Sequence, residues 1–169
     1  MGTRTTSPPP GFHRKRLDTM LQERVPEDSY RARTKPPEPS VCPQCGAIFN
    51  EGRWKWGEHP ASAHQDTCPA CHRINDQCPA GFVTLKGEFF LAHREEILEL
   101  ARNVEKRERA EHSLKRIIAT EEKDGGMLVT TTDIHLARGI GEAIHDAWHG
   151  DLEFHYNPGE YLLRVTWER

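Results

Sequence analysis

The clearest hydrophobic pattern lies in the second half of the chain. Between residues 88 and 111, apolar residues such as Ile97, Ala101 and Val104 recur at intervals close to one helical turn. This spacing places them on one side of a helix, so the pattern predicts an amphipathic helix over about residues 88–111. The last two turns are almost entirely charged, which is typical of a solvated helix surface.

A second helical pattern follows farther along the chain. One apolar stripe repeats at steps of three and four residues and ends before Gly150, a residue type that commonly stops a helix. Thr132 or Asp133 is placed to cap this helix at its start. The stripe consists of Ile134, Ala137, Gly141, Ile144 and Trp148.

A β-hairpin is predicted between these helices. Residues 114–120 read as one strand and residues 127–132 as its return. Asp124-Gly125-Gly126 lies between them, and an Asp-Gly pair favours the tight turns that hairpins need.

The chain ends in a second predicted strand pair. Residues 152–156 and 161–167 are joined by the short loop 157–160, which would place Tyr156 opposite Tyr161. One face of this pair is then apolar, and the other can bear opposite charges. The second, open face would carry Glu153, His155, Leu162, Arg164, Thr166 and Glu168.

These elements predict an α+β fold. The order α-β-β-α-β-β favours a two-layer domain, with four mostly antiparallel strands and both helices on one side. Three parts are expected: a basic, Pro-rich arm at 1–40, disordered or docking on a partner, a four-cysteine zinc-ribbon module at 41–81, and this α/β domain at 82–169.

Charge is divided unevenly among the three parts. The arm has eight Lys and Arg residues against five Asp and Glu, whereas residues 82–169 have twelve against seventeen. An acidic α/β domain argues against broad phosphate binding there, although a half-bare sheet can bind RNA. Any nucleic-acid contact is therefore expected in the arm, in the cysteine module or in a local patch.

Two Cys-x-x-Cys pairs carry the most specific chemistry. Cys42 and Cys45 precede Cys68 and Cys71 by a spacer that lets the chain fold back, so four thiolates can surround one metal ion. Zinc suits such a site, and four protein ligands leave no open position for catalysis. We expect a structural zinc site and no enzymatic activity. A disulfide pair, an iron–sulfur centre and unrelated thiols are the alternatives.

Aromatic and basic residues lie within the cysteine module. Arg53, Trp54, Lys55, Trp56 and Arg73 are the candidate RNA contacts, because aromatic rings can stack on bases and cations can pair with phosphates. The alternative is that the tryptophans build the small core that the module needs.

Three further residues are candidates for chemistry. Cys78 fits neither cysteine pair and is expected to be a free thiol. His145 and His149 have a spacing that can bind a metal on a helix, but no third ligand is evident. No apolar run is long enough to span a bilayer, and the cysteine usage favours a reducing cytoplasm.

Several motifs together resemble known proteins. They are CPQCG (42–46), Trp54-x-Trp56, CPACHRI (68–74), PAG (79–81) and TTTDIHLARGIGEAIHDA (130–147). Over residues 40–169 they look like an uncharacterised family of short bacterial zinc-ribbon proteins. The zinc module is similar to that of the large-ribosomal-subunit export adaptor family (nonsense-mediated-decay protein three), which has more Cys-x-x-Cys pairs and further domains.

The resemblance implies a zinc-binding protein that docks on the ribosome or on structured RNA, as an assembly or dormancy factor. In that family the zinc ligands correspond to Cys42, Cys45, Cys68 and Cys71 of this chain. A zinc-ribbon adaptor that binds another protein, and no RNA, is the second hypothesis. The sequence leaves the partner and the oligomeric state open.

Overall fold

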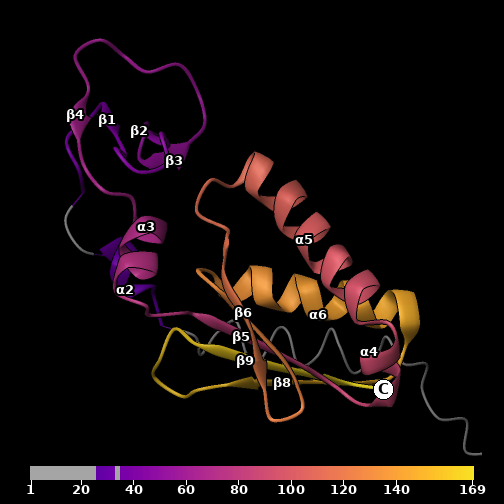
Figure 1. Ribbon diagram of the computed structural model, residues 1–169. Helices are drawn as coiled ribbons and strands as arrows, with labels where there is room; N and C mark the ends of the chain where they lie inside the picture. The colour runs from indigo at the N-terminus through magenta and orange to yellow at the C-terminus, as the bar shows by residue number, and fades with distance from the viewer. Residues whose placement is uncertain (1–25, 33–34) are drawn as a thin grey trace, which may run out of the picture.

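The chain forms two β-sheets and a set of helices, which confirms the expected α+β class. A computed structural model describes residues 26–32 and 35–169 (Figure 1). The smaller sheet has the strand order β3-β2-β1-β4, and the larger has the order β6-β7-β5-β9-β8. In chain order the elements are α2 (Ser29–Ala32), β1 (Ser40–Val41), β2 (Ile48–Asn50), β3 (Arg53–Lys55), β4 (His64–Gln65), α3 (Pro69–Asn75), β5 (Gly81–Lys86), α4 (Glu88–Ala92), α5 (Arg94–Glu111), β6 (Ile117–Lys123), β7 (Gly126–Thr131), α6 (Ile134–Trp148), β8 (Asp151–Tyr156) and β9 (Leu163–Glu168).

We call β1–β4 with α3 the cysteine unit, and β5–β9 with α4–α6 the α/β unit. Helix α2 comes from the predicted arm and lies beside α3 (Figure 1). Residues 1–25 and 33–34 of that arm lie outside the described residues. No helix in the described part of the chain is both long and apolar enough to cross a membrane.

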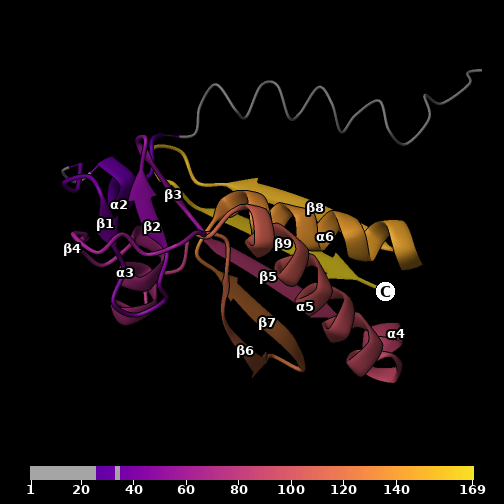
Figure 2. The same ribbon diagram turned by 90° about the horizontal axis from the view of Figure 1, so that it is seen from above.

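One face of the larger sheet packs against the helices. Alternate side chains of the central strands, Val83 and Leu85 on β5 and Val165 and Trp167 on β9, are completely buried. Helices α5 and α6 lie together on that side (Figures 1 and 2). Because side chains alternate along a strand, the opposite face stays open, and His155 is exposed on it as predicted.

The larger sheet has five strands, so the predicted four-stranded sheet is wrong. The unpredicted strand is β5, which pairs antiparallel with β7 and parallel with β9. The other two pairings are antiparallel, and the sheet is therefore mixed. β5 lies directly before the helical pattern at 88–111, and no separate strand was predicted there.

Both hairpins differ from the prediction in position. The first turn is as expected, since Asp124 and Gly125 both have positive φ, but β6 begins at Ile117, three residues later than predicted. In the second hairpin Tyr156 faces Leu163 instead of Tyr161. That register shift is two residues, so each side chain stays on its predicted face.

The helices, in contrast, lie close to the positions that the sequence predicts. The pattern over 88–111 forms two helices, because His93 has φ −119° and ψ 24° and interrupts the helix between α4 and α5. Helix α6 begins as expected, since the Asp133 side chain accepts a hydrogen bond from the Leu136 amide. The apolar stripe of α6 faces the core, where Ala137 and Ile144 are fully buried, and its last member, Trp148, is half-buried.

Candidate metal centre

The two Cys-x-x-Cys pairs come together between the smaller sheet and α3. Cys42 follows β1, and Cys45 lies in the turn after it, while Cys68 caps α3 and Cys71 lies in its first turn. Their four sulfur atoms all lie within 4.8 Å of one another, so they can hold a metal ion. Cys45 is half-buried and the other three cysteines are buried.

Backbone geometry explains why these sulfurs converge. The Gly46 amide donates to the Cys42 carbonyl over 2.8 Å, and Gly46 has φ +78°, a conformation that side chains rarely adopt. The Cys68 amide donates to Cys42 Sγ, and the Cys71 amide donates to Cys68 Sγ, each over 3.4 Å. These amides favour negative charge on the sulfurs they contact.

The spacing of the sulfurs fits a tetrahedral ion. Cys45 Sγ and Cys68 Sγ are 3.7 Å apart. A tetrahedral ion with metal–sulfur bonds of about 2.3 Å would separate its ligands by about 3.8 Å. Four sulfur ligands in this arrangement suit zinc or iron.

A buried arginine of the α/β unit reaches the cysteine cluster. Arg116, only 6% exposed, directs Nη1 to Cys71 Sγ over 3.3 Å and Nη2 to Cys68 Sγ over 3.7 Å. A guanidinium donates in a planar fork, so one side chain can serve two sulfurs.

Hydrogen bonding and charge favour a thiolate at this centre. The hydrogen bond from Cys68 lowers the pKa of Cys45 to about 4, and Arg116 acts in the same direction against the effect of burial. The same hydrogen bond between Cys45 and Cys68, together with burial, raises the pKa of Cys68. Burial acts to lower the pKa of Arg116, but hydrogen bonds and charge from the cysteines hold it above its ordinary value. Arg116 therefore remains a cation.

The predicted RNA contacts do not share one environment. Arg53 is exposed, Lys55 is paired with Glu51 over 2.7 Å, and the Trp54 ring lies 5.4 Å from that of Phe49. These three candidates lie on β3 of the cysteine unit.

The other two candidates are engaged inside the protein. Trp56 donates from Nε1 to the Arg109 carbonyl over 2.7 Å and packs against the cysteine cluster. An RNA contact needs an exposed cation, but the Arg73 side chain is buried and paired with Asp28 over 2.6 Å. Helix α3 turns Arg73 toward α2 of the arm, which the spacing of the cysteines does not reveal.

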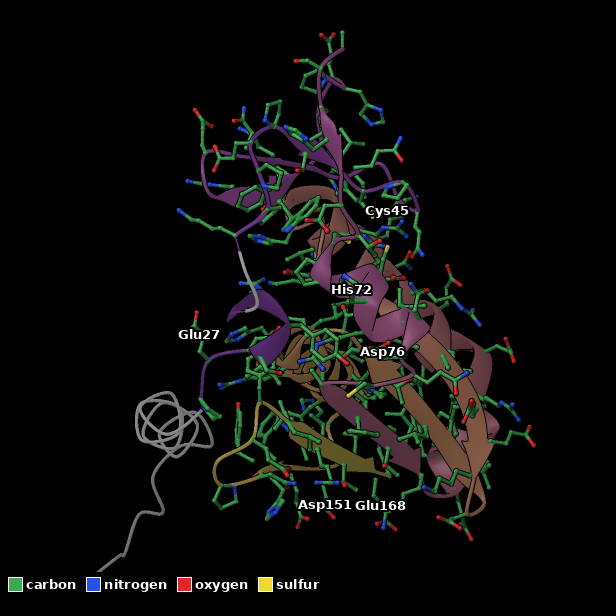
Figure 3. All side chains as sticks on the ribbon, turned by 90° about the vertical axis from the view of Figure 1, so that its left-hand side faces the viewer. Glu27, Cys45, His72, Asp76, Asp151 and Glu168 are labelled. Atoms are coloured by element: carbon green, nitrogen blue, oxygen red, sulfur yellow. The ribbon has the colours of Figure 1, made fainter. Side chains whose placement is uncertain are left out.

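A groove of about 650 Å³ lies between the arm, the cysteine unit and the end of α5. In Figure 3, Glu27 lies on its arm side and His72 on its α3 side. Ser113 also lines this groove, is 1% exposed, and its hydroxyl has no hydrogen-bond partner within the described residues. Further lining residues are Tyr30, Arg31, Lys35, Phe49, Arg53, Trp54, Lys55, Asp66 and Glu111.

The remaining candidates stay apart from the cysteine cluster. Cys78 is an exposed free thiol. The ring centres of His145 and His149 lie 6.1 Å apart, with the rings edge to face. Over residues 26–32 and 35–169, the four cysteines form the one group of side chains placed to hold a metal ion.

Three residues of this region were missed from the sequence. Arg116 lies within the expected strand 114–120, Ser113 directly precedes it, and Asp28 lies in the Pro-rich arm, so no local motif marks them. Their positions depend on contacts between residues far apart in the chain.

The chain was compared with protein-family models, curated proteins and solved structures, and none of them matches it.

Proposed function

We propose that this protein is a non-enzymatic zinc-binding protein. The supporting observation is the closed donor set, in which Cys42, Cys45, Cys68 and Cys71 supply four converging sulfurs. Zinc has no redox chemistry and accepts four thiolates in a tetrahedron, so it would stabilise the cysteine unit without leaving a position for a substrate. Metal binding would then contribute directly to folding.

We further propose that the protein docks on the ribosome or on structured RNA, as an assembly or dormancy factor. The groove is the observation that carries this proposal. Its lining includes Trp54 and the cations Arg31, Lys35 and Arg53. An aromatic ring can stack on an unpaired base while nearby cations contact the backbone phosphates. The motif resemblance to the ribosomal export adaptor family supports the ribosome as the source of that RNA.

The buried hydroxyl of Ser113 supports a polar ligand in the groove. Its side chain is free, within the described residues, to donate or accept one hydrogen bond. Glu27, Asp66 and Glu111 line the same groove, and their negative charge limits how many phosphates it can accept. Binding therefore rests on a few phosphate contacts together with stacking, and it weakens moderately with salt.

Co-sedimentation with ribosomes, at low and at moderate salt, tests this proposal. Wild-type, zinc-loaded protein should move with ribosomes, and Arg53→Ala or Trp54→Ala should weaken that association several-fold. Arg102→Ala is the matched control, because Arg102 is an exposed arginine on α5 whose partner is Glu99 on the same helix. The ribosome proposal is contradicted if wild-type protein stays at the top of the gradient at low salt, both with ribosomes from exponentially growing cells and with ribosomes from starved cells.

A protein-binding adaptor without RNA binding is the second candidate. It is favoured by the acidic surface of the α/β unit, where Asp151, Glu153 and Glu168 are exposed. Figure 3 shows Asp151 and Glu168 along the sheet, away from the groove beside His72. Such a surface suits a basic protein. The adaptor function would be favoured if the Arg53→Ala variant still bound a basic protein and the complex contained no RNA.

A further inference from the structure

Arg116 belongs to the α/β unit but reaches the metal ligands of the cysteine unit. It lies one residue before β6, and its amide donates to Thr132 Oγ1 over 3.0 Å. Its Nε donates to the Ser113 carbonyl over 3.1 Å, which orients the guanidinium. The two remaining nitrogens then face Cys71 and Cys68. The position of the guanidinium is therefore set by the α/β unit, while its partners belong to the cysteine unit.

Arg116 has no carboxylate partner among the described residues. The other buried arginine of this region, Arg73, is neutralised by Asp28 over 2.6 Å. A buried cation without a counter-charge is costly. Four thiolates around one divalent ion carry a net charge of about −2, and this charge would compensate Arg116.

Resting on the zinc binding proposed above, we propose that Arg116 is a positioning residue of the metal centre, and that metal binding through it joins the α/β unit to the cysteine unit. Charge-assisted hydrogen bonds from the guanidinium stabilise the bound thiolates. Because coupling is reciprocal, metal that is held more tightly through Arg116 also stabilises the attachment of the α/β unit.

A neighbouring contact crosses the same joint. Trp56 of the cysteine unit donates to the Arg109 carbonyl near the end of α5 over 2.7 Å. Its ring also lies 6.0 Å from the Arg116 guanidinium, within the range of a cation–π interaction. The tryptophan can shield the arginine–sulfur contacts from water, which strengthens them.

Metal affinity and release rate test the proposal directly. Arg116→Met removes the charge and the donors while keeping a long apolar side chain, and we expect zinc affinity, measured by chelator competition, to fall about 10- to 100-fold. Cobalt substitution should give a shifted thiolate charge-transfer band in this variant, because the hydrogen bonds to sulfur are lost. Arg138→Met is the matched control, since Arg138 is a partly buried arginine that pairs with Glu142 on α6.

A comparison with and without metal tests the coupling. Zinc should raise the urea midpoint of the α/β unit, followed by far-UV circular dichroism of its helices. The increase should be larger in wild type than in Arg116→Met. Equal affinity, release rate and cobalt spectrum in wild type and Arg116→Met overturn the proposal.

If Arg116→Met does not fold, Arg116→Lys decides the question. It keeps the charge but loses the two-sulfur fork, so a folded Arg116→Lys protein should release zinc faster than wild type. A release rate equal to that of wild type in folded Arg116→Lys also overturns the proposal.

Discussion

Asp28 and Arg73 form a buried ion pair, with 2.6 Å between Asp28 Oδ1 and Arg73 Nη2. The pair joins the arm to α3, and the Arg73 guanidinium also lies 4.2 Å from the centre of the Tyr30 ring. Arg73 Nη1 donates in addition to the Cys78 carbonyl over 3.0 Å. This arrangement uses Arg73 to attach the arm, so the side chain is not available to a phosphate.

Removing one member of this pair should be strongly destabilising. Asp28→Ala leaves a buried, unpaired guanidinium, which typically costs about 3–5 kcal/mol in the free energy of unfolding. Urea denaturation measures this loss. Glu99→Ala is the control, because it breaks an exposed pair with Arg102 and should cost less than about 1 kcal/mol. A loss below about 1 kcal/mol for Asp28→Ala would show that the arm is not held by this pair.

Loss of one cysteine ligand should release the metal. In Cys68→Ser, three thiolates remain, and we expect less than one metal ion per chain by elemental analysis together with partial unfolding of the cysteine unit. Cys78→Ser is the matched control, because Cys78 is exposed and lies outside the cluster. Full metal content in Cys68→Ser would disprove the four-cysteine assignment.

The aromatic core of the α/β unit is tested at Trp167. This side chain is fully buried, and its Nε1 donates to the His149 carbonyl over 2.6 Å. Trp167→Ala should therefore destabilise the protein by about 3–5 kcal/mol in urea melts. His155→Ala, on the open face of the neighbouring strand, should change stability by less than about 0.5 kcal/mol. Equal losses in the two variants would mean that the faces of the sheet are assigned incorrectly.

Two glycines should respond in opposite directions to the same substitution. A Cβ at Gly81 would come closer than van der Waals contact to Thr131 Oγ1 and Ala137 Cβ, so Gly81→Ala should cost about 1–3 kcal/mol. A Cβ at Gly139, inside α6, would meet nothing within 4 Å. Gly139→Ala should stabilise the protein by about 0.5–1 kcal/mol, because alanine favours helix. Thermal and urea melts of both variants check the prediction, and stabilisation by Gly81→Ala would contradict the close packing of β5 against α6.

Local patterns in the sequence were sufficient for several elements. The spacing of the cysteines predicted Cys42, Cys45, Cys68 and Cys71 as metal ligands, and the sulfurs of these four residues do converge. The helix α6 and its Asp133 cap were predicted correctly, since a helix stripe and an N-cap depend on residues close together in the chain. The Asp124-Gly125 turn was predicted for the same reason.

Only the tertiary structure decided how these elements meet. The central position of β5 depends on pairing with β7 and with β9, both of which come later in the chain. Arg116 contacts Cys71, which lies 45 residues earlier in the sequence, and Arg73 contacts Asp28, which also lies 45 residues earlier. Such long-range pairings carry no periodic signal, because they are set by how packed elements bring distant side chains together. Packing, and not local pattern, therefore turned Arg73 away from the surface and directed Arg116 to the cysteine sulfurs.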